Sequence, residues 1–218
     1  MRDMDNTAGR ETAPAPMPHT RRSYTAPDHA TAQARILRAL TGVVPAPRVH
    51  SVDGADLVCD TPQGRGGAAV LNGRTATTVL AACGRALAKI HRVDTAAAFE
   101  DPPSTGILVH GDFRPERLLF APHELRITGI VGWDHAHIGS AMEDLAWCEW
   151  SIRRRHPECF DAIPHLYYGY GIEVPPWRPR QAAMLAKCRH LGALAAQRKD
   201  GTAMTWQRHA AVTAAWRQ

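Results

Sequence analysis

The chain has 218 residues, 44% of them hydrophobic and 22% charged, so it can form one domain or two small lobes around a shared cleft. It contains no apolar run of the roughly 20 residues needed to span a bilayer, and its N-terminal residues lack the apolar core of a secretory signal. Its five cysteines form no CxxC pair, which disfavours a disulfide scaffold and a zinc ribbon. We therefore expect a reduced, cytoplasmic protein without a membrane partner.

The net charge of +5 is concentrated in residues 145–218, which contain eleven basic and five acidic residues. Such a stretch could attract phosphates or nucleic acid. Because no nucleic-acid-binding motif accompanies the charge, we interpret it as the solvated surface of Arg-rich helices and expect no nucleic-acid partner.

The first elements in chain order form a small lobe. Residues 1–28 are rich in proline and lack an apolar period, which predicts a flexible tail. A helix is expected from an N-cap at Asp28 to Gly42. Two short strands, Arg48–Val52 and Leu57–Cys59, should then form a hairpin at Asp53-Gly54, followed by a Gly-rich loop over residues 61–67.

The remainder predicts a larger, mainly helical body. Its expected elements are a helix over residues 77–93, strands at 107–109, 118–120 and 127–131, a helix from Ala141, and helices over 178–198 and 203–216. The fold class is therefore α+β. We expect a flexible tail at 1–28, a reduced N-terminal lobe with a hinge at 29–67, and a helical C-terminal lobe with a hairpin at 68–218.

One segment concentrates residues with chemical potential. The apolar strand ending at Val109 leads into a loop with His110 and Asp112, and the following strand pair brings Asp134 back towards it. Two carboxylates at the mouth of one cleft can take a proton from a hydroxyl group or hold Mg²⁺.

This segment resembles the core signature of the aminoglycoside phosphotransferase and choline kinase-like family: His-Gly-Asp at 110–112, then Gly-Ile-Val-x-Trp at 129–133. Further similarities in the same order are Ala34–Leu40 with Val44–Val49, Asp56–Gly64, Leu87–His91 and Glu143–Trp147. The resemblance covers roughly residues 30–216. It implies a protein-kinase-like fold with a reduced N-terminal lobe and a mainly helical C-terminal lobe.

The resemblance also implies roles for individual residues in transfer of a phosphoryl group from ATP or GTP, with Mg²⁺, to a hydroxyl group. Asp112 would orient or accept the hydroxyl proton, His110 would support the loop, and Asp144 would brace that loop by accepting N–H bonds. Asp60, Thr61 and Gly64 would belong to the hinge that binds the nucleotide base.

Several positions depart from the family pattern. The residue expected to be a metal-binding Asn is Arg117, which cannot bind a cation but can pair with Asp112 or Asp134 or contact a phosphate. The main metal-binding Asp is replaced by Gly132, which leaves Asp134, expected on the same face of a strand, as the candidate metal ligand. The usual Glu of the small-lobe helix is Gln33, and only Arg21 or Arg22 could stand in for the basic residue upstream.

These departures favour a degenerate kinase that binds a small molecule, a peptide or a partner protein with little or no phosphoryl transfer, and that needs no cofactor. The alternative is an active phosphotransferase with Asp112 as base, Arg117 as phosphate clamp and Asp134 as metal ligand. Its substrate would be a small metabolite or antibiotic, anionic or neutral rather than polycationic because the C-terminal third is basic.

Two other interpretations remain open. His135 and His137 could join His110, Asp112 and Asp134 in a zinc or iron site. The aromatic residues Tyr167, Tyr168, Tyr170 and Trp177 could form a partner surface, although we expect them in the core of the helical lobe.

Overall fold

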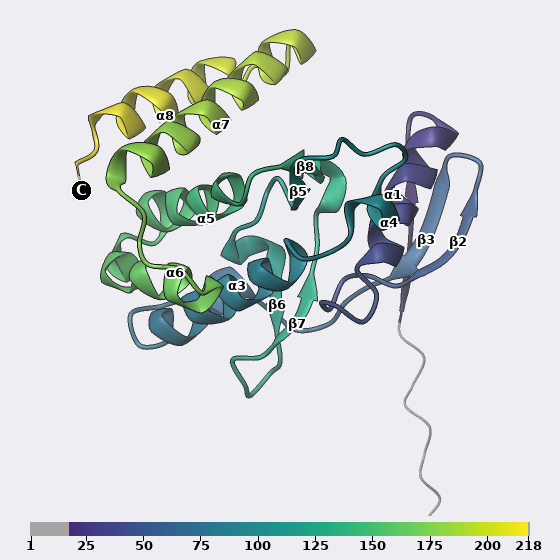
Figure 1. Cartoon of the computed structure of the whole chain (residues 1–218), viewed down its shortest axis with the longest axis horizontal. Coiled ribbons are helices and arrows are strands. Elements are labelled where there is room, and N and C mark those ends of the chain that lie inside the picture. The colour runs from purple at the N-terminus through teal and green to yellow at the C-terminus, as the bar shows by residue number, and fades with distance from the viewer. Residues whose placement is uncertain (1–17, 218) are drawn as a thin grey trace, which may run out of the picture.

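The computed structural model describes residues 18–217 and divides them into two lobes (Figure 1). The smaller lobe packs helix α1 (Pro27–Ala39) against an antiparallel sheet in the order β1-β3-β2. Its strands are β1 (His19–Ser23), β2 (Val49–Asp53) and β3 (Asp56–Asp60). The hairpin expected at Asp53-Gly54 is confirmed, since Asp53 pairs with Asp56 across the turn.

The N-terminal boundary differs from the sequence expectation. Residues 1–17 of the expected flexible tail lie outside the described residues, but His19–Ser23 form strand β1, which pairs with the whole of β3. All five residues of β1 are exposed and none is apolar. The sequence of this strand therefore lacks the alternation of apolar and polar residues that predicts a strand. The following helix begins with Pro27 and not after Asp28, because proline is well suited to the first turn.

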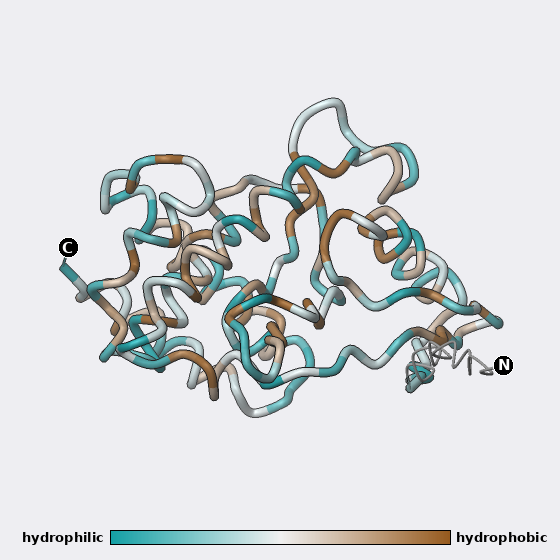
Figure 2. The backbone as a smooth tube through the Cα atoms, turned by 90° about the horizontal axis from the view of Figure 1, so that it is seen from below, coloured by the Kyte–Doolittle hydropathy of each residue, from teal (hydrophilic) through white to brown (hydrophobic). Residues whose placement is uncertain are grey.

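The larger lobe contains the expected long helices α3 (Ala76–Ile90), α5 (Ala141–Arg155), α7 (Trp177–Arg198) and α8 (Ala203–Ala215). The apolar face of α3, with Val79, Leu80, Leu87 and Ile90, is fully buried in the main core. A second core joins α5, α7 and α8 around the stacked rings of Trp147 and Trp150. Hydrophobic and hydrophilic residues alternate along much of the backbone (Figure 2). No described helix is both long and apolar enough to cross a membrane.

Two small sheets stand between the lobes' helices and carry the central loops. One has the order β4-β6-β7, from β4 (Arg65–Gly66), β6 (Leu118–Phe120) and β7 (Ile127–Ile130). The other pairs β5 (Ile107–Val109) with β8 (His137–Gly139), a strand that its three residues did not reveal in the sequence. Strand β4 likewise lies within the expected Gly-rich loop.

Short helices complete the body: α2 (Gly67–Val70), α4 (Thr95–Ala98) and α6 (Pro164–Tyr170). Helix α6 packs closely along α3, and two glycines permit the approach. A Cβ atom at Gly84 would lie 2.1 Å from the Leu166 carbonyl oxygen, and one at Gly169 would lie 2.3 Å from the Ala81 carbonyl oxygen. In α6 Tyr167 is buried as expected, whereas Tyr168 is 58% exposed.

We predict that Gly84→Ala destabilises the protein by about 3 kcal/mol, because the added methyl group meets main-chain atoms that cannot move independently. Urea unfolding followed by circular dichroism measures the change. Gly73→Ala is the control: its Cβ would come no closer than 4.0 Å to the Glu158 carbonyl oxygen, so its effect should stay within about 0.5 kcal/mol. Equal effects from the two substitutions would contradict the close-packing argument.

Candidate active-site cleft

The central loop between β5 and β6 is held by a buried carboxylate from the next helix. Asp144, in the first turns of α5, accepts hydrogen bonds from the backbone N–H groups of His110 (2.7 Å) and Gly111 (2.9 Å) and contacts His91 Nε2 at 3.1 Å. Burial alone would raise the pKa of Asp144, but these donors lower it below its usual range. The expected bracing contact is thus present, and it fixes the loop that carries Asp112.

His110 is fully buried, and its ring is used within the loop. Its Nδ1 accepts the backbone N–H of Asp112 at 3.2 Å, and its Nε2 lies 3.1 Å from the Val131 carbonyl oxygen, to which it can donate. Burial lowers the pKa of His110 and favours this neutral ring. His110 therefore links the backbone of the central loop to the segment that follows β7.

Every acceptor direction of the Asp112 carboxylate is occupied. Oδ1 accepts from Arg114 Nε at 3.0 Å and from Trp147 Nε1 at 2.9 Å. Oδ2 accepts from Arg117 Nε at 2.7 Å and pairs with Arg117 Nη2 at 2.5 Å. A carboxylate has about four acceptor sites. Burial alone would raise the pKa of Asp112, but the hydrogen bonds from Arg114, Trp147 and Arg117 lower this pKa to about 2.

Arg117 fills the space beside Gly132. A Cβ atom at Gly132 would lie 2.9 Å from Arg117 Nε and 3.0 Å from Arg117 Cδ. Gly132 also has φ of +84°, a conformation that other residues rarely adopt. Of the pairings that the sequence allows for Arg117, the structure forms the one with Asp112.

Asp134 lies elsewhere than the sequence analysis placed it. Residues Trp133–His135 form a 3₁₀ turn and not a strand, so the alternation that would put Asp134 on the face of Gly132 does not apply. Its carboxylate pairs with Arg22 of β1, with Nη2 at 2.9 Å from Oδ1 and 3.0 Å from Oδ2. Arg22, one of the two expected stand-ins for the basic residue, thus binds the candidate metal ligand.

A cavity between the lobes is lined by two of the three residues that the resemblance assigns to the hinge. Its volume is about 170 Å³, and its lining includes Asp60, Thr61, Gln33, Arg22 and Gly132. Gly64, the third expected hinge residue, is not part of the lining and packs against the Phe120 carbonyl. Typical small-molecule sites enclose roughly 300–1,000 Å³, so this cavity is small for a nucleotide.

A second cavity, of about 190 Å³, opens on the other side of Asp112. Its charged lining is mainly basic, from Arg114, Arg155 and Lys187, with His135 beside them. Burial lowers the pKa of Lys187, whose ammonium group has no carboxylate within 4 Å among residues 18–217. Trp147 and Lys187 were not predicted as site residues, because their positions depend on the packing of α5 and α7. Arg114 was also not predicted, although it contacts Asp112 only two residues away in the same loop.

The alternative zinc or iron cluster of His110, Asp112, Asp134, His135 and His137 does not form within the described part of the chain. His110 Nε2 lies against the Val131 carbonyl, and His137 pairs with Glu143 at 3.0 Å. The side chains are therefore directed to separate partners.

Comparison with known proteins agrees with the resemblance in the sequence. Residues 96–183 match the model of the phosphotransferase enzyme family. Among solved structures, the macrolide 2′-phosphotransferase MphH of Brachybacterium faecium has a TM-score of 0.64 at 17% identity, over 92% of this chain and 86% of that one. The GDP complex of aminoglycoside 2′-phosphotransferase-IIIa gives 0.66 at 13% identity, over 85% and 81%.

A third structure, the aminoglycoside phosphotransferase APH(3″)-Id of Streptomyces rimosus with ADP and streptomycin, has a TM-score of 0.57 at 14% identity, over 76% of this chain and 83% of that one. Curated sequences match over short stretches only. A probable acyl-CoA dehydrogenase of Arabidopsis thaliana is 46% identical over 44 residues, and human acyl-CoA dehydrogenase family member 11 is 41% identical over 39. These matches span 20% and 18% of this chain and 5% of each relative's length.

We predict that Asp112→Asn destabilises the protein by about 2 kcal/mol at pH 7 and that this difference closes between about pH 4 and pH 2. The folded pKa of Asp112 lies below its unfolded value, so its contribution is present above the unfolded pKa and is lost as the pH falls towards 2. Unfolding in urea across that range measures it. Asp53→Asn, in the exposed hairpin turn, should stay within about 0.5 kcal/mol of wild type. A constant difference for Asp112→Asn would contradict the charge pairing.

Proposed function

We propose that this chain, which has the kinase-like fold of the aminoglycoside phosphotransferases and matches the model of the phosphotransferase enzyme family over residues 96–183, is a degenerate member of that family. It binds a small anionic molecule in the cleft and transfers little or no phosphoryl group. The single observation that carries the proposal is the complete occupation of the Asp112 carboxylate by donors of the chain itself.

The state of Asp112 argues against its use as a base. A base must present a free oxygen to the proton it accepts, with a pKa near the working pH. Asp112 instead pairs with Arg114 and Arg117, and its pKa of about 2 favours the deprotonated form that the two arginines neutralise. For a substrate hydroxyl to reach Asp112, Arg117 would have to leave.

The residues at the positions expected to bind the metal also argue against phosphoryl transfer. Gly132 has no ligand atom, Arg117 holds a fixed positive charge beside it, and Asp134 is neutralised by Arg22. In phosphoryl transfer Mg²⁺ neutralises the charge that develops on the phosphate oxygens, and losing that effect raises the barrier by several kcal/mol. The arginines replace the charge of the metal but cannot bridge phosphate oxygens as a coordinated ion does.

The ligand class follows from the basic cavity beside Asp112. Its cations are Arg114, Arg155 and Lys187, and the one carboxylate in its lining, Asp112, is paired with Arg114 and Arg117. Arg155 pairs with Glu116 outside the lining, so Lys187 is the cation of this cavity without a carboxylate within 4 Å among residues 18–217. A carboxylate or phosphate group would therefore find cations there, whereas an amine-rich aminoglycoside would meet like charge. A small anionic metabolite, or an acidic side chain of a peptide or partner protein, fits this chemistry.

The alternative is an active phosphotransferase that uses ATP or GTP with Mg²⁺. Proteins of similar fold were solved in complex with ADP and with GDP, which supports this alternative. In this chain that activity would require Arg117 to release Asp112 and Arg22 to release Asp134 when the nucleotide binds. The two ion pairs would then compete directly with the metal.

We expect isothermal calorimetry of the purified chain to show no binding of ATP or GTP that depends on Mg²⁺. The double substitution Arg117→Asn with Gly132→Asp should create such binding, because it frees Asp112 and returns a carboxylate to the metal position. Mg²⁺-dependent nucleotide binding by the wild type, with turnover that Asp112→Asn abolishes, would overturn the proposal.

The single substitution Gly132→Asp is the matched control for this experiment. The new side chain would meet Arg117 Nε and Cδ and would pair with its guanidinium group, so it should give no nucleotide binding by itself. If the single substitution were as effective as the double one, Arg117 would not be the block that we infer.

The anionic ligand can be tested with inorganic pyrophosphate. We expect pyrophosphate to raise the melting temperature and Lys187→Gln to weaken its binding about tenfold, because a half-buried cation is lost from the cavity. Arg189→Gln, at an exposed position of the same helix, is the control and should bind as the wild type does. Equal losses in both variants would indicate attraction to the general positive charge and not to this cavity.

A further inference from the structure

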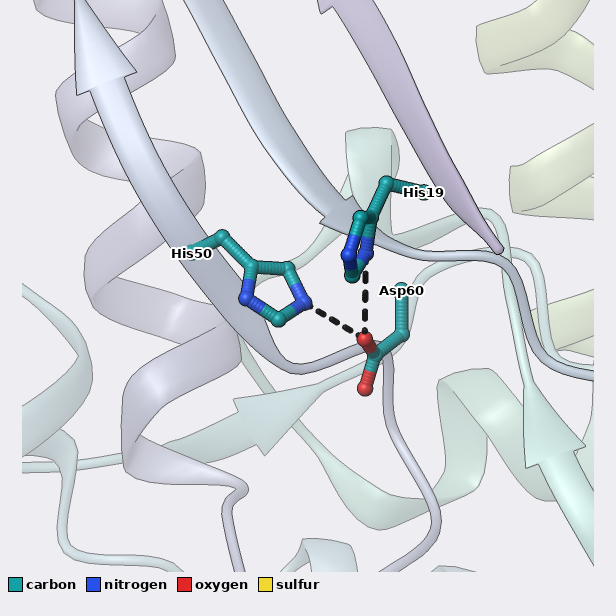
Figure 3. Close-up of side chains that lie close together, drawn as sticks. All are labelled: His19, His50 and Asp60. Carbon is teal, nitrogen blue, oxygen red and sulfur yellow. Dashed lines mark hydrogen bonds and ion pairs between the residues drawn. The ribbon is translucent and has the colours of Figure 1, made fainter. Parts of the chain in front are cut away.

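Three side chains able to bind a metal meet at one end of the small-lobe sheet, away from the central loop. His19 begins β1, His50 lies in β2 and Asp60 ends β3, and both rings approach the same carboxylate (Figure 3). His50 Nε2 is 2.6 Å from Asp60 Oδ1, and His19 Nδ1 is 3.6 Å from it. One ligating atom from each residue lies within 4.8 Å of the other two, which no other group of three His, Cys, Asp or Glu side chains in residues 18–217 achieves.

The backbone builds this cluster. His19 lies directly opposite Asp60 in the pairing of β1 with β3. The pairing of β2 with β3 has a bulge at His50, between the pairs Val49–Cys59 and Ser51–Val58. A bulge inserts one extra residue and redirects its side chain, and bulges are over-represented beside functional sites. Here it places the extra residue, a histidine, against the carboxylate.

Main-chain hydrogen bonds hold the ends of the three strands together. The N–H group of Asp60 donates to the Arg48 carbonyl at 2.9 Å, and that of Thr61 donates to the Pro18 carbonyl at 2.7 Å. The hydroxyl groups of Thr20 and Thr61 are also hydrogen bonded. The ligating side chains are therefore presented by a fixed frame. The side chains of His19 and His50 are 48% and 36% exposed, so solvent ions have access.

We propose that this cluster binds a divalent transition-metal ion of the zinc class. The ligands are His19 Nδ1, His50 Nε2 and the Asp60 carboxylate, with water in the remaining position. Two imidazoles and a carboxylate suit zinc, whereas Mg²⁺ prefers oxygen ligands alone. Around a tetrahedral ion with bonds of about 2.1 Å, ligand atoms lie roughly 3.4 Å apart. The separation between His19 and Asp60 fits, and a small rotation of the carboxylate opens the contact with His50.

The ion would act on the small lobe. It would tie the polar strand β1 to both strands of the hairpin, adding to the side-chain bonds that Arg21 and Ser23 make with Asp56. Asp60 and Thr61 also line the cavity between the lobes, so metal binding would fix one wall of that cavity. The proposal is independent of whether the cleft transfers phosphate.

The experiment uses the full chain without an affinity tag, freed of metal with EDTA and dialysed. Zn²⁺ binding is measured by competition with a chromogenic chelator, and Co²⁺ binding by its visible absorption. We expect one equivalent of Zn²⁺ per chain and a rise in melting temperature that EDTA reverses. Mg²⁺ at the same concentration should give no shift.

His19→Gln, His50→Gln and Asp60→Asn should each weaken Zn²⁺ binding by about 100-fold or more and remove the Co²⁺ absorption. His123→Gln, at an exposed histidine between β6 and β7, is the matched control and should bind as the wild type does. Circular dichroism checks that the variants fold. The proposal is wrong if the wild type binds no Zn²⁺, or if the stoichiometric site survives in the double variant His19→Gln with His50→Gln.

Discussion

The geometry of the cleft depends on the hydrogen bonds that the buried Asp144 carboxylate accepts. It receives the backbone N–H groups of His110 and Gly111 from the loop and contacts His91 at the end of α3, so one side chain joins β5, α3 and α5. A buried carboxylate without such donors would be strongly destabilising. The same contacts set the direction in which the loop leaves β5. The placement of Asp112, Arg114 and Arg117 depends on that direction.

Within this frame, charge is balanced by the chain itself. Asp112 faces Arg114 and Arg117, and Asp134 faces Arg22. A phosphotransferase cleft with free carboxylates would need a divalent cation to compensate them, and that ion would arrive and leave with the nucleotide. Here the compensating positive charges are arginine side chains of the same chain, and they do not leave with a ligand. The result is a cleft whose acidic groups are paired with arginines of the chain, while Lys187 in the basic cavity has no carboxylate within 4 Å among residues 18–217.

The sequence predicted what periodicity and residue chemistry determine locally. The apolar face of α3 and the hairpin at Asp53-Gly54 have clear patterns, and both agree with the structure. For Arg117 the sequence allowed a phosphate contact or an ion pair with Asp112 or Asp134, and the structure forms the ion pair with Asp112. Strand β1 could not be found, since its five exposed residues owe their conformation to pairing with β3.

The remaining differences between prediction and structure arise from tertiary packing. The prediction that Asp134 shares a strand face with Gly132 was wrong. Gly132 has a positive φ and leads the chain into a 3₁₀ turn, whereas the prediction assumed a strand. Trp147 reaches Asp112 only because α5 packs beneath the central loop. The bulge at His50 has no signature in the amino-acid pattern, as it reflects the register between two strands that are otherwise regular. Contacts between residues more than thirty positions apart, such as those of Asp112 with Trp147 and of Arg22 with Asp134, are of this kind.

The ion pair between Arg22 and Asp134 has a mechanical consequence. Arg22 belongs to β1 of the small lobe and also lines the cavity between the lobes, whereas Asp134 belongs to the larger lobe, so this ion pair joins the two lobes beside that cavity. A motion that separates the lobes at this point would have to stretch the ion pair. Both side chains are more than a third exposed, so dissolved salt screens their attraction. Raising the ionic strength should therefore weaken the electrostatic link between the lobes.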